Sequence, residues 1–295
     1  MPSYRLSIGY RLFTIGNMAF LTLLALTCLF PLIHVFSVSL SSAQAVSAGA
    51  VKLWPVEFST ASYEAALAKK EFLQAFWITI QRSVIGTSTS MILMILLAYP
   101  LSKDNRQFRF RTVYAWYFVF TMIFGGGLIP TYVVVKSTGL IDSIWALIIP
   151  SAIIVFNVVV LLNFFRNLPK ELEESAKLDG ANHWTILWRI YVPVSLPALA
   201  TVLLLTVIWH WNSWFDGLIY MNQPRHYPLQ TYLQTTIVSK DLSEMSAQEA
   251  EKYLRVSIRT GRAAQIFIAA LPILLAYPFL QRFFVKGMII GSVKE

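Results

Sequence analysis

Residues 16–38 read GNMAFLTLLALTCLFPLIHVFSV and contain no Asp, Glu, Lys or Arg. A hydrocarbon core about 30 Å thick needs roughly 20 helical residues, because each rises about 1.5 Å. Arg5 and Arg11 precede the run and Ala43-Gln44-Ala45 follows it, as in a cleaved signal peptide. The run is, however, longer than the roughly 7–15 apolar residues of a signal-peptide core. We therefore expect it to persist as a membrane-spanning helix.

Five further apolar runs of similar length follow along the chain. They cover residues 76–100, 112–134, 143–165, 195–220 and 263–285. Of the 295 residues, 56% are hydrophobic and 13% charged, whereas soluble domains carry about a quarter charged residues. The many aromatic and branched residues exclude a disordered chain. The sequence predicts an all-α, polytopic membrane protein with six spans in a single domain over residues 1–295.

The basic residues predict how the spans are oriented. The short loop 101–111 contains Lys103, Arg106, Arg109 and Arg111. Because Lys and Arg are enriched in short cytoplasmic loops, we expect this loop and both termini on the inner side. The formal charge of +9 does not indicate nucleic acid binding, since the basic residues are spread along the chain. Residues 39–75 and 221–262 then form long outer segments.

The sequence predicts no cofactor or metal site within the chain. Its single cysteine, Cys28, lies in an apolar run, which excludes a disulfide framework and a thiolate metal site. The four histidines lie in different segments without ligand spacing: His34, His183, His210 and His226. A Gly-x-x-x-x-Gly-Lys-Ser/Thr motif for nucleotide phosphates is missing. Gly125-Gly126-Gly127 predicts close helix packing or a break in the third span.

The segment 168–193, between the fourth and fifth runs, has the pattern of a helical hairpin. Pro169 suits a first helical position, and the acidic residues after it complement a helix N-terminus. Gly180 can adopt the left-handed conformation that ends a helix. Residues 183–189 form a second, amphipathic segment with two tryptophans. Small residues in the first helix and bulky ones in the second suit docking into a cleft of another protein.

Within this hairpin, Glu174-Ser175-Ala176, three residues and Gly180 are followed by Ile190-x-Val192-Pro193. The spacing resembles the EAA loop of permease subunits of binding-protein-dependent carbohydrate ABC importers. Ser175 replaces the usual alanine and Val192 the usual leucine. Three further runs resemble the LplC/YtcP-type branch, which includes the alginate importer permease: Phe124–Pro130, Trp209–Ser213 and Gly287–Lys294.

The resemblance implies a type I ABC importer fold, six helices with a cytoplasmic coupling helix, in the bacterial cytoplasmic (inner) membrane. It also implies a heterodimer with a second homologous permease, two ATPase subunits that bind ATP and magnesium, and an extracytoplasmic sugar-binding protein. The chain itself is then not an enzyme. The residues expected to couple to the ATPases are Glu174, Ser175, Ala176, Asp179, Gly180, Ala181, Gly291, Ser292 and Lys294.

The expected cargo is an oligosaccharide or polysaccharide. The outer segment 221–262 favours an acidic sugar such as an alginate fragment, because it holds Arg255, Arg259 and Arg262. The same segment contains Ser246-Ala247-Gln248-Glu249, a capping-box pattern that could open a short helix, either a solvated surface helix or a docking element.

The fifth span suggests a sugar pathway. On a continuous helix, Trp209, Asn212, Ser213 and Asp216 share one face, with Trp211, Trp214 and Phe215 opposite. A carboxylate within the membrane usually faces a water-filled cavity or the protein interior. Tryptophan offers a platform for a sugar ring, and Asn212 can donate and accept hydrogen bonds. The alternative is an interfacial belt of tryptophans.

Arg82 in the second span supports three interpretations. It could contact a hydroxylated or carboxylated sugar, pair with Asp216, or extend toward the membrane surface. Two other classes of protein also remain open. Ser88 or Ser90 with His210 would suit an intramembrane protease, although no nucleophile turn is present. An ion-driven secondary transporter would usually show inverted repeats, and we find none.

Overall fold

The computed structural model describes residues 8–238 and 258–292, and most of these lie in helices. Within these ranges the only β pairing is an isolated antiparallel bridge between Ser41 and Phe58. The predicted all-α class is therefore confirmed. The capping-box pattern at 246–249, Arg255 and Lys294 lie outside the described residues.

Among the described residues, three helices are long and apolar enough to cross a membrane. They are α1 (Ile8–Ser39), α4 (Lys70–Ser102) and the part Arg259–Pro278 of α16 (Ile258–Ser292). Three bent helix pairs pass the same test if each pair counts as one span, which gives up to six spans among the described residues. By length and composition, the structure thus accommodates the six predicted spans.

The third and fourth predicted spans are not continuous helices. α5 (Arg111–Ile123) and α6 (Leu128–Ser137) meet at 115° across the glycine run, where Gly127 has φ +86°. α7 (Ile144–Ile148) and the 3-10 turn η1 (Ile149–Ser151) meet α8 (Val155–Arg166) at 50° beside Pro150. Glycine permits the left-handed turn and proline lacks the amide that would continue a helix. Of the two interpretations of the glycine run, the structure shows the break.

The fifth predicted span, 195–220, is also interrupted. α12 (Leu196–Asn212) ends where Ser213 turns extended, with ψ +128°, and α13 (Phe215–Tyr220) is a separate short helix. Before α12, the helical segment His183–Val194 meets it at 82°. The expectation of a single helix over 195–220 was therefore wrong.

Contacts divide the chain into two compact units. Unit 1 comprises residues 1–69 and 240–269, and its described part holds α1, α2 (Ala43–Ser47), α3 (Ala61–Leu67) and the start of α16. The rings of Phe36 and Phe267 lie 4.7 Å apart and join α1 to α16. The single domain expected from sequence stays a prediction.

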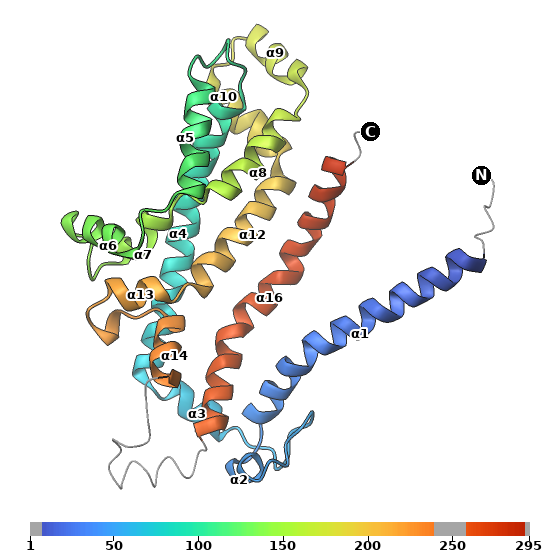
Figure 1. Ribbon diagram of the computed structural model, residues 1–295, viewed down its shortest axis with the longest axis vertical. Coiled ribbons are helices and arrows are strands. Elements are labelled where there is room, and N and C mark those ends of the chain that lie inside the picture. Colours follow the sequence, from blue (N-terminus) through green and yellow to red (C-terminus); the bar gives the residue numbers. More distant parts are fainter. Residues whose placement is uncertain (1–7, 239–257, 293–295) are drawn as a thin grey trace. The chain divides into compact units, whose positions relative to one another are not determined.

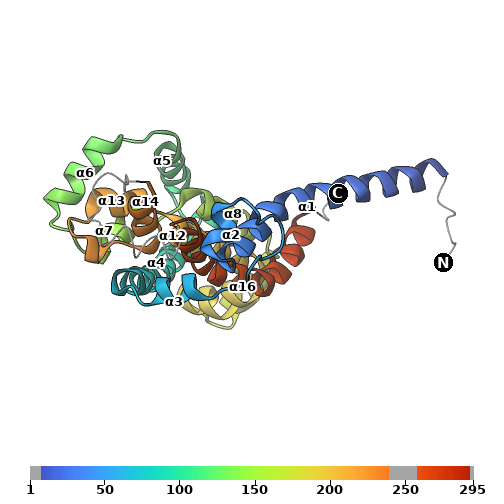
Figure 2. The same cartoon turned by 90° about the horizontal axis from the view of Figure 1, so that it is seen from below.

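Unit 2 comprises residues 70–239 and 270–295, and α4 packs against both α8 and α12 in it (Figures 1 and 2). Met94, Leu161 and Val202 are among the buried residues that join these three helices. At one end lie α9 (Lys170–Leu178) and α10 (His183–Ile186), which continues through the π-helical η2 (Leu187–Tyr191) into α11 (Val192–Val194). At the opposite end lie α13 and α14 (Leu229–Val238), with the turn η3 (Pro224–His226) between them in sequence (Figure 1).

Candidate functional site

The predicted hairpin over 168–193 forms. α9 begins directly after Pro169 and ends at Leu178, and Gly180 two residues later has the predicted left-handed conformation, with φ +78°. The side-chain oxygen of Asn182 then accepts a hydrogen bond from the Thr185 amide at 2.9 Å and caps α10. Asn182 is a capping signal that the sequence interpretation did not use.

One face of α9 points to solvent. Its members recur at helical spacing and are Glu171, Glu174, Ser175 and Leu178. Leu178 is 89% exposed, at the end of the helix. Beyond it, Asp179 and Gly180 are exposed and Ala181 is half-buried, whereas Ala176 is buried. Most of the predicted coupling residues are therefore accessible. An exposed leucine beside carboxylates also suits the groove of a partner protein.

Behind this face, α9 carries a buried group that we call the Lys103 cluster (Lys103, Glu173, Tyr191 and Tyr99). Lys103 Nζ donates to Glu173 Oε2 at 2.7 Å and to the Tyr191 hydroxyl at 2.9 Å. The Tyr191 hydroxyl donates to the same Glu173 oxygen at 2.8 Å. Lys103 Nζ also lies 4.0 Å from the ring centroids of both tyrosines. Each of the four residues is buried.

The electrostatics of the Lys103 cluster keep Glu173 ionised. Burial raises the pKa of Glu173, but hydrogen bonds from Lys103, Lys177 and Tyr191 outweigh burial and lower this pKa to about 2. Burial lowers the pKa of Lys103, and the hydrogen bond to Glu173 opposes that shift. Burial and the Glu173 carboxylate raise the pKa of Tyr191, so its hydroxyl stays protonated and donates. Glu173 therefore remains a carboxylate at neutral pH.

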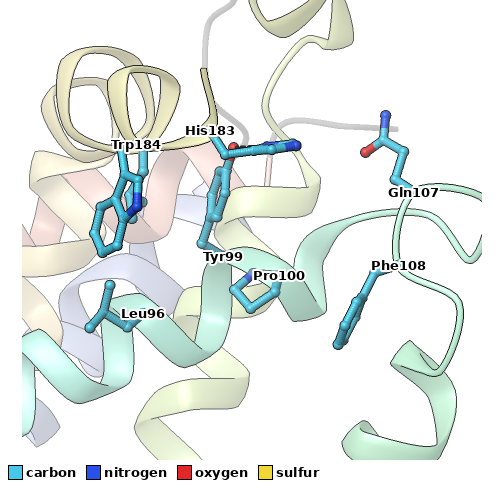
Figure 3. A pocket seen from close by; sticks show the side chains of 8 residues that line it. Leu96, Tyr99, Pro100, Gln107, Phe108, His183 and Trp184 are labelled. Carbon is cyan, nitrogen blue, oxygen red and sulfur yellow. Dashed lines mark hydrogen bonds between the residues drawn. The ribbon is translucent and has the colours of Figure 1, made fainter. Parts of the chain in front are cut away.

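A pocket of about 310 Å³ opens beside this cluster (Figure 3). It lies between the end of α4, the following loop and α10, and Trp184 and Phe108 stand on opposite sides of it. The Tyr99 hydroxyl and His183 Nδ1 lie 3.1 Å apart in its lining. The remaining lining residues are Leu96, Pro100, Gln107 and Leu187.

At the other end of unit 2, Arg82 pairs with Asp216. The Arg82 side chain is 0% exposed and forms an ion pair with Asp216, with Nη1 3.1 Å from Oδ1. Arg82 also donates to the carbonyl oxygens of Ser213 at 3.2 Å and Leu147 at 3.4 Å. Of the three interpretations open for Arg82, the structure shows the pairing. Arg82 is therefore inaccessible to a sugar in this conformation.

The helix break after Asn212 rearranges the predicted pathway face. Trp209, Asn212 and Ser213 line a hollow of about 370 Å³, together with Leu205, Ile208, Trp214 and Phe215. Asp216 is not among its lining residues and turns to Arg82. The expectation that Trp214 and Phe215 lie opposite Trp209 was wrong, because Ser213 leaves the helical conformation and the 100° rotation per residue stops there. Trp211 does face away and is buried, 6.0 Å from the Phe76 ring.

Ser90 and His210 meet in the core, as a protease would require. Ser90 Oγ and His210 Nε2 lie 3.3 Å apart. Both residues are 0% exposed, and His210 Nδ1 has no hydrogen-bond partner among the described residues. A hydrolytic site needs an accessible nucleophile and a group that orients the histidine through Nδ1. This geometry does not support a protease.

The remaining predicted residues lie at the C-terminus. Gly291 and Ser292 are the last residues of α16, and Lys294 lies outside the described residues. In the described parts of the chain, no cluster of three or more His, Cys, Asp or Glu side chains could hold a metal ion.

The apolar spans and the exposed face of the α9 hairpin are the features of a multi-span membrane protein. Residues 90–290 match the family described as "Binding-protein-dependent transport system inner membrane component", and the chain belongs to this family. Its place in the inner membrane follows from this membership, and the resemblance found in the sequence is confirmed. A binding-protein-dependent permease replaces the protease and secondary-transporter alternatives.

Two relatives come from Bacillus subtilis (strain 168). The chain is 41% identical over 289 residues to the polygalacturonan/rhamnogalacturonan transport system permease protein YtcP, covering 96% of this chain and 99% of YtcP. It is 38% identical over 285 residues to protein LplC, covering 96% and 95% of the two chains. Both matches run along nearly the whole chain.

Two solved structures contain similar chains. One is a bacterial ABC transporter involved in the import of the acidic polysaccharide alginate, with 36% identity, a TM-score of 0.87 and coverage of 96% of this chain and 100% of that one. The other is a bacterial alginate ABC transporter in complex with alginate pentasaccharide-bound periplasmic protein. At 18% identity and a TM-score of 0.54, with 93% of this chain and 96% of that chain covered, it shares the fold alone. The predicted ABC importer permease fold is thus confirmed.

Proposed function

We propose that this chain is the transmembrane subunit of an ATP-driven importer and forms half of a pathway for an oligosaccharide or polysaccharide. The observation that carries the proposal is the arrangement of unit 2. The hairpin of α9 and α10, whose outer face is exposed, lies at one end of the unit, and α13 lies toward the opposite end (Figure 1). The aromatic hollow is lined by the last residues of α12 and the first residue of α13. One end thus suits a motor protein, and the other suits a sugar.

Two partner ATPase subunits, which bind ATP and magnesium, supply the energy in this proposal. They contact the exposed face of α9, and the C-terminal residues Gly291, Ser292 and Lys294 provide a second contact. This chain is then not an enzyme. When the ATPases close, the hairpin moves, and the spans joined to it switch between inward-open and outward-open states. The hairpin and both termini lie in the cytoplasm.

A second, homologous permease completes the pathway as a heterodimer, and an extracytoplasmic binding protein delivers the cargo. α5 supports a helical partner or lipid on its surface, because none of its residues is buried. Trp116 and Ile123, for example, are exposed. Large apolar surfaces of this kind are stable only against lipid or another helix.

The cargo in this proposal is an acidic polysaccharide fragment. Two similar proteins support it, since one is a polygalacturonan/rhamnogalacturonan transport system permease and the other belongs to a transporter involved in the import of the acidic polysaccharide alginate. The hollow supports a sugar ring, because Trp209 is 53% exposed in it and the Asn212 amide is accessible. A tryptophan face and an amide are the groups that hold a ring and its hydroxyls.

Uptake by the reconstituted transporter tests this function. The chain is co-expressed with the partner permease, the ATPases and the binding protein, and uptake of labelled uronic-acid and neutral oligosaccharides into proteoliposomes is measured. We expect ATP-dependent uptake of the acidic sugar. Uptake that persists after the catalytic glutamate of the ATPase is disabled would contradict the proposal.

The pathway is tested separately with Trp209→Ala and Asn212→Ala. Each is expected to lower uptake, because the hollow loses a platform or an amide. Trp77→Ala, at a tryptophan of α4 in the same unit that is 58% exposed and lies in no proposed site, is the matched control and should transport normally. Unchanged affinity and rate in both hollow variants would remove the hollow from the pathway.

A further inference from the structure

The coupling helix is held to its own protein by very few side chains. Of the nine residues of α9, only Glu173 and Ala176 are buried, and Ala176 is small. An ordinary surface helix attaches through an apolar stripe. In α9 the large buried side chain is instead a carboxylate, so its ion pair to Lys103 replaces the usual hydrophobic contact.

Three elements meet at this ion pair. Lys103 follows the last residue of α4, Glu173 belongs to α9, and Tyr191 ends η2, from which the chain enters α11 and α12. The Tyr191 ring also contacts Tyr99 of α4 at 5.1 Å and Phe165 of α8 at 5.4 Å. A force on α9 therefore reaches α4, α8 and α12 through one buried set of contacts.

The contacts are directional and rigid. A charged hydrogen bond of 2.7 Å, the shared tyrosine hydroxyl and two ring faces fix Lys103 Nζ from several sides. Loss of Glu173 leaves the Lys103 ammonium buried without a charged partner, whereas loss of Lys103 leaves Glu173 only the ammonium of Lys177, whose Nζ lies 2.7 Å from Oε1. The group therefore has one favoured arrangement and resists sliding of α9 along α4.

We propose that Lys103 and Glu173 are positioning residues that make α9, the end of α4 and η2 move as one body during transport. This inference rests on the proposed docking of ATPases on α9. Without the ion pair, ATPase closure shifts α9 while the spans stay behind, so ATP is hydrolysed without transport.

A second ion pair on the same helix and loop provides a matched control. Lys170 Nζ lies 3.1 Å from Asp104 Oδ2, but these side chains are 75% and 67% exposed. Exposed pairs contribute little and hold no fixed geometry. Lys170→Met should therefore leave coupling unchanged, although it also removes a lysine that joins α9 to the loop after α4.

The test compares sugar transported per ATP hydrolysed in the complete, purified transporter in proteoliposomes with the loaded binding protein. For Lys103→Met and Glu173→Gln we expect this ratio to fall roughly five- to a hundredfold, the usual range of coupling between two sites. Tyr191→Phe keeps the ring and loses one hydroxyl, so it should give a smaller fall. The double variant Lys103→Glu/Glu173→Lys should recover only part of the loss, because the pair is restored in reverse but the Lys177 ammonium, 2.7 Å from Glu173 Oε1 in the wild type, then faces a like charge.

Each outcome decides a different point. Unchanged ratios in Lys103→Met, Glu173→Gln and Tyr191→Phe would overturn the inference, and so would an equal fall in Lys170→Met. If Lys103→Met or Glu173→Gln does not assemble, Tyr191→Phe decides alone. If the ATPases neither copurify with the wild-type chain nor crosslink to α9, the proposed function itself fails, whatever the ratios are.

Discussion

Removing the Asp216 carboxylate should destabilise the protein more than removing the Arg82 guanidinium. In Asp216→Ala, the guanidinium of Arg82 stays 0% exposed and keeps only the carbonyl oxygens of Ser213 and Leu147 as partners. Leaving a buried charge without its ionic partner lowers the free energy of unfolding by about 3–5 kcal/mol. In Arg82→Met, the Asp216 carboxylate is 20% exposed and still accepts the Gly217 amide at 2.8 Å, so we expect a smaller cost of about 1–3 kcal/mol.

The measurement is thermal unfolding of the complete transporter in lipid nanodiscs at one fixed scan rate, since membrane complexes unfold irreversibly. Asp216→Ala should have the lowest midpoint, and the double variant Arg82→Met/Asp216→Ala should be more stable than Asp216→Ala alone. Additive losses in the double variant would refute a buried, mutually dependent pair. In transport assays Arg82→Gln should reduce uptake of acidic and neutral sugars alike, whereas a change in their ratio would show that Arg82 contacts the cargo.

Three further predictions concern the packing and the hairpin. Gly86→Ala should destabilise the protein by about 1–3 kcal/mol, because its Cβ would lie 2.8 Å from the His210 ring, whereas Gly16→Ala in α1 has open space and should be neutral or slightly stabilising. Gly180→Ala should lower the stability by about 1–2 kcal/mol and weaken ATPase copurification, because alanine disfavours a φ of +78° although no atom crowds the site. Gly180→Asn should have a milder effect, since asparagine tolerates this conformation better. An equal loss in both variants would contradict the backbone explanation. Since the folded-state pKa of Glu173 is about 2, below the ordinary 4.5, its stabilisation is present above about pH 4.5 and is lost as the pH falls toward 2. The stability difference between wild type and Glu173→Gln, followed by acid unfolding, should therefore shrink over that window, and a constant difference would be inconsistent with the depressed pKa.

The amino-acid sequence predicts the class of fold and the hairpin because both depend on local patterns. Span length follows from apolar runs, and the end of α9 follows from Gly180, whose φ is +78°. The Lys103 cluster could not be predicted in this way. Lys103 and Glu173 are 70 residues apart, and each has a sufficient local explanation, one as a cytoplasmic basic residue and the other as an acid near a helix start. Only the packing of α9 against the end of α4 reveals that they pair.

The helix break at Ser213 explains why the lining of the hollow could not be predicted from the sequence. Inside a membrane, a broken helix leaves carbonyl groups that must find donors within the protein. Arg82 Nη1 donates to the Ser213 carbonyl at 3.2 Å, and Thr231 Oγ1 donates to the Trp214 carbonyl at 2.7 Å. Both donors come from other helices, so the residues around Ser213 alone favour a continuous helix. Gly217 permits the close approach of Thr231, because a Cβ there would collide with the Thr231 hydroxyl. The buried Arg82 therefore has a role that needs no contact with cargo: it stabilises the break that brings Trp209 and Trp214 to one hollow.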